Sequence, residues 1–275
     1  MPPQATGRRD SMPFTAAHPA AAIPLVKPLG RFGVLSALVI GSLAPDLAYF
    51  LPLPISRAQS HSLAALGWFC LPVGGLTYLY FHLVLRPFLG DLIGPGLRSR
   101  LLPDGPNGVP PSSVAAVVAS LLIGAVTHLA WDSVTHPGGF VVEAVPRLRA
   151  PLFSWGGYTF FGYKLLQHGS TLLGLGLIAW WTRRRWMRSP APASPTSVEP
   201  GAIRRLIALA AMFVPPIFVT VRAWAATPHR AAGPLAALQD ILGHAVFTGG
   251  KVAVAALVLA SLVWRWLGTR DRRQH

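Results

Sequence analysis

Cysteine and charge are both scarce in this sequence. Its 275 residues include one cysteine, Cys70, and only 12% of them are charged. A single cysteine excludes a disulfide framework and a metal site built from several thiolates. Soluble domains carry about 25% charged residues, so about half of the usual charge is missing. The composition is therefore unlike that of a soluble globular domain.

Acidic residues are rarer than basic ones. Nine Asp and Glu residues against 24 Lys and Arg residues give a net charge of +15. Such a charge can serve nucleic-acid binding, but here the basic residues lie between long apolar blocks, where the topology signals of membrane proteins belong. No basic patch is interleaved with exposed aromatic residues. The sequence therefore predicts no nucleic-acid partner, and the predicted partner is the lipid bilayer.

Six apolar blocks run through the chain, each close to the length that crosses about 30 Å of hydrocarbon as a helix. Lipid cannot satisfy backbone polar groups, so we expect each block to be helical. The sequence predicts an all-α fold, a polytopic transmembrane helix bundle of about six spans. The predicted spans are 33–53, 63–85, 113–134, 165–182, 203–225 and 245–267.

The segments between these spans differ in charge. With the N-terminus inside, the inner segments hold 17 basic residues and the outer segments hold six. Because cytoplasmic loops are enriched in Lys and Arg, both termini are predicted to face the cytoplasm. The predicted organisation is a disordered extension at 1–11, a motif-bearing core of four spans at 12–182, a Pro- and Ser-rich linker at 183–202, and two C-terminal spans with a basic tail at 203–275.

Polar residues that are unusual in a membrane gather toward the predicted outer ends of four spans. His128, Asp132 and His136 follow one another at intervals of four residues, so they stack on one helix face. Imidazole and carboxylate together suit a divalent metal, with Zn or Mn as the expected ion. The other candidate metal ligands are Asp46, His61 and His168, and the candidate catalytic residues are Lys164, which would neutralise an anionic substrate group, and Gln167.

Other interpretations of the same residues stay open. The His and Asp residues also suit a structural network that cross-links helices, or a proton or ion pathway. Lys164 also suits a snorkelling anchor at the membrane surface. Seven aromatic residues in the segment 137–163 suit either an aromatic belt at the headgroup level or a lid that grips a lipid-like substrate.

Five ordered blocks of the sequence carry a family resemblance. They are Met12–Thr15 with His18-Pro19, Gly41–Asp46, Ser60-His61-Ser62, His128–His136 and Tyr163–Ser170. Over about 12–182 they resemble a bacterial membrane family called domain of unknown function 4184, which has no established activity. More remotely, the order of motifs is similar to inner-membrane metal-dependent hydrolases and to zinc-dependent phospholipase C, although the downstream His-x3-Glu of the phospholipases is missing. That resemblance implies that five residues are metal ligands: His18, Asp46, His61, His128 and Asp132.

His18 raises a conflict between the two lines of argument. The distribution of basic residues puts it on the cytoplasmic side, away from the other candidate ligands. However, the segment 14–29 is apolar and its prolines permit at best a short, broken helix. We therefore expect this segment to enter the bundle as a re-entrant hairpin, which would bring His18 to the other ligands.

Together, the residues and the resemblance predict a membrane-embedded, metal-dependent hydrolase of the bacterial inner membrane, acting on a lipid or phosphoester at the outer leaflet. The alternatives are a proton- or ion-coupled transporter and a non-catalytic structural membrane protein. Polar residues that converge on one leaflet favour the enzyme, because transporter sites usually lie near the midplane between repeats. The sequence contains no internal repeat.

Overall fold

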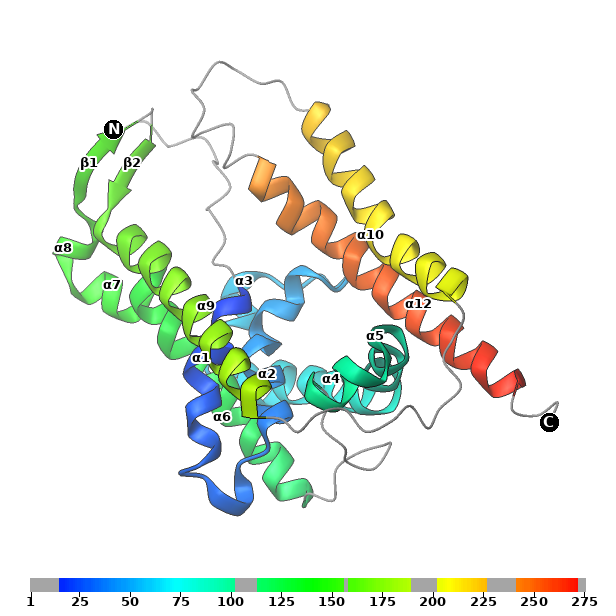
Figure 1. Ribbon diagram of the computed structural model, residues 1–275. Helices are drawn as coiled ribbons and strands as arrows, with labels where there is room; N and C mark the ends of the chain where they lie inside the picture. Colours follow the sequence, from blue (N-terminus) through cyan, green and yellow to red (C-terminus); the bar gives the residue numbers. More distant parts are fainter. Residues whose placement is uncertain (1–14, 102–112, 156–157, 189–201, 227–240, 272–275) are drawn as a thin grey trace.

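The fold is built from helices and one two-stranded antiparallel sheet (Figure 1). The computed structural model describes residues 15–101, 113–155, 158–188, 202–226 and 241–271. The predicted all-α fold is confirmed apart from the small sheet, and the predicted extension at 1–11 lies outside the described residues. In chain order the elements are η1 (Thr15–Ala17), α1 (Pro19–Ala22), η2 (Ile23–Val26), η3 (Gly30–Phe32), α2 (Leu35–Leu43), η4 (Ala44–Tyr49), α3 (Arg57–Ser60), η5 (Leu66–Cys70), α4 (Leu71–Tyr80), η6 (Phe81–Leu85), α5 (Arg86–Leu101), α6 (Val114–Thr135), α7 (Phe140–Ala144), α8 (Pro146–Arg149), β1 (Pro151–Trp155), β2 (Tyr158–Phe161), α9 (Gly162–Arg188), α10 (Ala202–Ala225), η7 (Ala245–Gly249) and α12 (Gly250–Asp271).

Four helical stretches of the described chain are long and apolar enough to cross a membrane. The predicted count of about six is not confirmed. The first predicted span is a shorter apolar helix, Leu35–Tyr49, and the fourth falls in α9, whose Gln167 and His168 make its apolar stretch more polar. The four stretches are Leu66–Ile93, Val114–Ala144, Arg205–Ala225 and Ile241–Leu267.

Helices α2 and α6 pack in backbone contact at the centre of the fold. A Cβ atom at Gly41 would collide with the backbone of Leu121, and one at Gly124 would collide with the backbone of Leu38 and Ser42. Small residues let membrane helices approach this closely. The contact places the last turn of α2 directly beside α6.

The N-terminal segment enters the bundle, as expected from its apolar composition. Short turns η1, α1 and η2 contact α2, α6 and α9, and Ala17, His18 and Ala22 are buried. The Ala17 backbone lies so near α9 that a Cβ at Gly174 would be in tight contact with it. His18 is thereby brought into the interior of the protein.

A β-hairpin follows α7 and α8 in the predicted aromatic segment. Strands β1 and β2 pair antiparallel, with a register irregularity between Pro151 and Phe153. The Phe153 ring stacks on Phe160 at 4.6 Å between centroids, and Phe153 and Trp155 are exposed. Figure 1 shows the hairpin projecting at one end of the molecule, beyond α9.

The two C-terminal helices pack against the region of α4 and α5. Phe88, Ala208 and Trp264 form a buried cluster, and the indole N–H of Trp264 donates a hydrogen bond to Asp91 Oδ2 at 3.1 Å. Part of the predicted linker at 183–202 is helical, because α9 continues to Arg188 and α10 begins at Ala202. Residues 189–201 lie outside the described residues.

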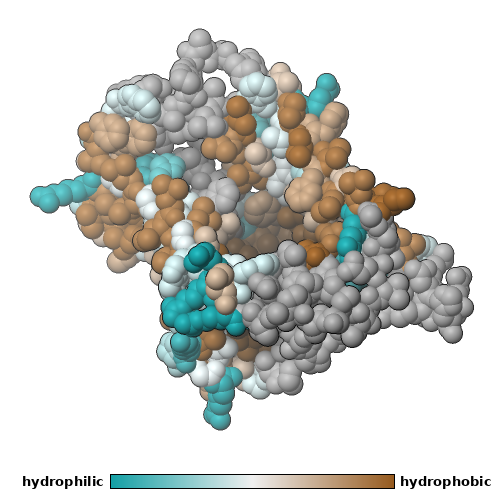
Figure 2. All heavy atoms as spheres, in the orientation of Figure 1, coloured by the Kyte–Doolittle hydropathy of each residue, from teal (hydrophilic) through white to brown (hydrophobic). Residues whose placement is uncertain are grey.

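Apolar side chains cover much of the exposed surface (Figure 2). Exposed residues include Leu172 and Leu173 on α9 and Leu206, Phe213 and Phe218 on α10. In water so much exposed apolar surface would be unfavourable, whereas lipid tails solvate it. The surface therefore agrees with a membrane protein.

Replacing Gly124 by Ala should destabilise the protein by about 1–3 kcal/mol, because the added methyl group would push α2 away from α6. Thermal unfolding of the detergent-purified protein measures the loss. Gly75→Ala on α4 is the matched control, since a Cβ there meets nothing within 4 Å. Alanine at that helical position should be neutral or stabilise by up to about 1 kcal/mol. Equal melting temperatures for the two variants would contradict the backbone contact.

Candidate metal centre

Two elements, α6 and η4, bring two carboxylates and an imidazole together. His128 and Asp132 lie one turn apart near the C-terminal end of α6, with His128 Nε2 3.4 Å from Asp132 Oδ2. Asp46 lies in η4, directly after Pro45, which has no N–H to continue α2 as an α-helix. Its Oδ1 atom is 3.6 Å from His128 Nε2. All three side chains are buried.

The short helix α3 supplies the second imidazole. Ser56 and Gln59 form a capping box that fixes the start of α3, and His61 follows the last residue of that helix. His61 Nε2 lies 3.1 Å from Asp46 Oδ1, 3.4 Å from Asp132 Oδ2 and 3.3 Å from His128 Nε2. Residues of η4 and the end of α3 thus converge on the C-terminal end of α6.

The spacing of these atoms fits a metal ion. Asp46 Oδ1, His61 Nε2, His128 Nε2 and Asp132 Oδ2 are separated by 3.1, 3.3, 3.4, 3.4 and 3.6 Å in the five pairs given above. Ligands at about 2.0–2.2 Å from a tetrahedral ion lie about 3.3–3.6 Å apart. Most of the separations also exceed the usual length of an N–H···O hydrogen bond. Asp46, His61 and His128 therefore form one group of possible ligands at coordination spacing, and Asp132 adjoins it through His61 and His128.

The outer ring nitrogens of both imidazoles have partners in the protein. His128 Nδ1 donates to the Ser42 carbonyl oxygen at 2.8 Å, which leaves Nε2 of the neutral ring with a lone pair. His61 Nδ1 lies 2.9 Å from the Ser60 hydroxyl. The Nε2 atoms of both rings therefore face the carboxylate oxygens of Asp46 and Asp132.

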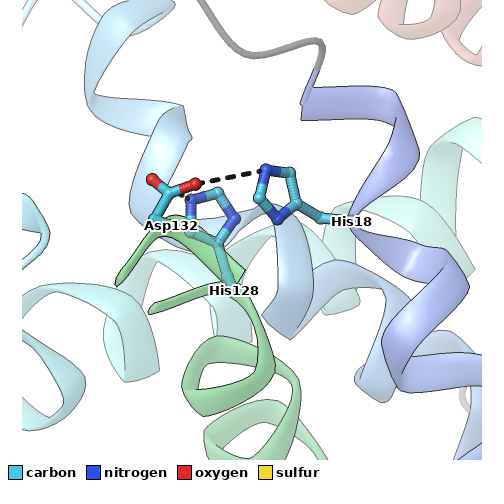
Figure 3. Close-up of side chains that lie close together, drawn as sticks. All are labelled: His18, His128 and Asp132. Carbon is cyan, nitrogen blue, oxygen red and sulfur yellow. Dashed lines mark ion pairs between the residues drawn. The ribbon is translucent and has the colours of Figure 1, made fainter. Parts of the chain in front are cut away.

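His18 lies beside His128 and Asp132 (Figure 3). Its ring stacks on His128 at 3.9 Å between centroids, and its Nε2 is 3.6 Å from Asp132 Oδ1. Burial, and then the neighbouring His128, lower the pKa of His18 to about 3, so the ring is neutral at physiological pH. Two groups of possible metal ligands result, His18 with His128 and Asp132, and Asp46 with His61 and His128.

His136 supports Asp132 from the end of α6. Its Nδ1 is 3.1 Å from Asp132 Oδ1, and its Nε2 accepts a hydrogen bond from the Gln167 amide at 3.0 Å. An imidazole whose second nitrogen is held by a hydrogen bond is typical of the layer that orients metal ligands. The structure thus brings Gln167 to the cluster through His136.

Arg57 and Tyr49 also contact the cluster, and the sequence analysis did not identify them. The Arg57 guanidinium is 2.6 Å from Asp132 Oδ2 and donates to the Tyr49 hydroxyl at 3.1 Å. Arg57 was counted only as a basic residue of an outer segment. Its position four residues before His61 was the one signal that could have identified it.

Helix α9 carries two further candidate residues, His168 and Lys164. His168 is exposed although Gln167 beside it is buried, because successive residues of a helix point about 100° apart. Lys164 is buried, and its ammonium lies 5.5 Å from the centre of the Tyr163 ring.

Comparison with known proteins identifies a family. The family described as "Domain of unknown function (DUF4184)" matches residues 12–262. The chain belongs to this family. The match extends beyond the four predicted spans of 12–182 and includes most of the two C-terminal helices of this DUF4184 protein. No curated protein and no solved structure matches the chain, so the remote similarity to hydrolases and phospholipases is not shown.

Replacing Gln167 by Leu should lower the stability of the protein by about 1–3 kcal/mol, because buried His136 Nε2 then loses its donor. Thermal unfolding of the purified protein measures this change. The neighbouring exposed residue provides the control, and His168→Leu should shift stability by no more than about 0.5 kcal/mol. A Gln167 variant as stable as the His168 variant would argue against the hydrogen bond between α9 and His136.

Proposed function

We propose that this protein is a membrane-embedded, metal-dependent hydrolase that acts on a lipid or phosphoester at the outer leaflet. One observation supports the proposal most directly. Two imidazole nitrogens and two carboxylate oxygens lie 3.1 to 3.6 Å apart in five pairs, in a buried place where two carboxylates are unfavourable without a cation.

The ligand chemistry favours Zn or Mn, because the set combines imidazole with carboxylate and contains no thiolate. Asp46, His61, His128 and Asp132 would hold the ion. A divalent ion in such a site lowers the pKa of water toward 7 and so supplies a nucleophile for hydrolysis. Neighbouring residues of the chain would orient these metal ligands. Ser42 and Ser60 fix the two imidazoles, and His136 fixes Asp132.

We also propose a six-helix arrangement in the bacterial inner membrane, with both termini in the cytoplasm. The excess of basic residues in the inner segments supports this orientation. The cluster lies near the C-terminal end of α6, away from Val114 at its start, and this position supports a site that opens toward one leaflet. Helix α9 and the stretch Leu35–Tyr49 would complete the set of six, as shorter or more polar helices beside the four apolar ones.

His128→Ala and Asp132→Ala should each lose a divalent metal ion that the wild-type protein carries, because each removes one of four ligands. Elemental analysis of protein purified without chelators measures metal per chain. His168→Ala is the control, since this exposed histidine lies away from the ligand atoms, and it should keep the full metal content.

A metal-free wild type that also fails to bind added Zn or Mn would overturn the hydrolase proposal. If such a protein also melted lower after each substitution, its His and Asp residues would instead form a structural network. Loss of proton or ion flux in both variants, with no metal in the wild type, would identify a transporter.

The orientation can be tested with single cysteines in a Cys70→Ser background. Leu63→Cys, an exposed position between α3 and η5, should react with a membrane-impermeant thiol reagent in intact cells. Arg183→Cys, near the C-terminal end of α9, should react only after permeabilisation. The reverse pattern would mean that the protein has the opposite orientation.

A further inference from the structure

Arg57 is the cationic side chain that joins the cluster to the surface. Its side chain is 34% exposed, whereas those of Asp46, His61, His128 and Asp132 are between 0% and 10% exposed. Arg57 is therefore more exposed than the four candidate ligands that it adjoins.

The guanidinium shares a ligand atom with the proposed metal ion. One terminal nitrogen of Arg57 is 2.6 Å from Asp132 Oδ2, and the same oxygen lies 3.4 Å from each of His61 Nε2 and His128 Nε2. Without a divalent ion, Arg57 neutralises part of the charge of the two carboxylates. With an ion bound, Asp132 must be shared between two cations, and its bond to Arg57 becomes weaker.

Charge balance then calls for an anion. Two carboxylates, one guanidinium and neutral imidazoles carry a net charge of about −1, and a divalent ion changes this to about +1. A buried positive charge is unfavourable unless it is paired. Arg57 is well suited to supply part of an anion site, because a planar guanidinium binds phosphate or carboxylate through two parallel hydrogen bonds.

The position of Arg57 indicates which anion. Arg57 and the proposed metal ion share Asp132 Oδ2. The group that Arg57 binds therefore lies at the reacting centre and not at a remote end of the substrate. A carboxylic ester or amide is neutral at its reacting carbon, whereas a phosphoester carries its negative charge on the reacting group. Phosphate therefore fits both the charge of the site and the position of Arg57.

We propose that Arg57, oriented by the Tyr49 hydroxyl, binds the phosphate group of a phosphoester substrate beside the metal ion. The inference rests on the proposed function and names its substrate class. Tyr49 holds one terminal nitrogen of the guanidinium at 3.1 Å and leaves the other to exchange Asp132 for a phosphate oxygen. The capping box of α3 fixes the backbone that carries both Arg57 and His61.

The test measures zinc affinity and phosphate affinity separately. In zinc-loaded protein, Arg57→Gln should weaken the binding of inorganic phosphate about tenfold to a hundredfold, because a charge-assisted hydrogen bond is lost. The same substitution should leave zinc affinity unchanged or increase it, because a competing cation is removed from Asp132. Arg57→Lys, which keeps the charge without the planar fork, should give an intermediate phosphate affinity.

Arg149→Gln is the matched control, since Arg149 is an exposed arginine that is also paired with a carboxylate, Glu143, at 3.0 Å. It should change neither affinity. Vesicles of phosphatidylcholine with and without phosphatidic acid add a second arm. Tighter Arg57-dependent binding to phosphatidic acid than to inorganic phosphate identifies a lipid headgroup as the source of the phosphate, and equal affinities identify a soluble phosphoester.

The possible failures are distinguishable. A wild type that binds no zinc would overturn the proposed function, and the inference with it. Zinc-loaded Arg57→Gln protein that binds phosphate as tightly as the wild type would overturn the inference alone. Weaker zinc binding in the Arg57→Gln and Arg57→Lys proteins, with unchanged phosphate affinity, would show that Arg57 only orients Asp132.

Discussion

The contact between α2 and α6 is the constraint on which the rest of the structure depends. Gly41 and Gly124 let the two backbones touch, and only at that distance can the Ser42 carbonyl oxygen accept a hydrogen bond from His128 Nδ1. That bond fixes the tautomer and the rotation of the imidazole. The same approach carries Asp46, four residues after Ser42, to the opposite side of the ring. A tight helix–helix contact therefore determines the chemistry at the end of α6.

Burial makes this cluster costly and also explains its composition. An isolated carboxylate in a low-dielectric interior is strongly unfavourable, yet Asp46 and Asp132 are both buried. Each lies against imidazoles, and Asp132 also pairs with Arg57. A purely structural core would be more stable with apolar residues of similar volume. Two buried carboxylates that adjoin the same imidazoles therefore belong to groups that could hold a metal ion.

The sequence predicted the centre of the cluster because its members follow simple geometry. The four-residue spacing put His128 and Asp132 on one face, and alternation of helix direction brought Asp46 and His61 to the same end. His18 came only from a family resemblance and from the apolar character of its segment. Arg57 and Tyr49 were missed because a basic residue and a tyrosine between spans are typical of any membrane protein. His168 and Gln167 are neighbours on α9, but their side chains point in different directions. Only the rotation of α9 about its axis decides which of the two side chains faces the cluster.

The number of spans was harder to predict, for a reason connected with the site itself. Helix α2 ends at Leu43 and continues as η4 through Pro45 and Asp46, and the whole apolar stretch Leu35–Tyr49 is shorter than a spanning helix. In α9, Gln167 lies within the apolar stretch and contacts His136, which lowers the hydropathy by which a membrane helix is recognised. Helix α6 carries His128 and Asp132 but keeps a strong signal, because the rest of it is long and apolar. The stretches that lack such residues, α10 and α12, keep a strong signal.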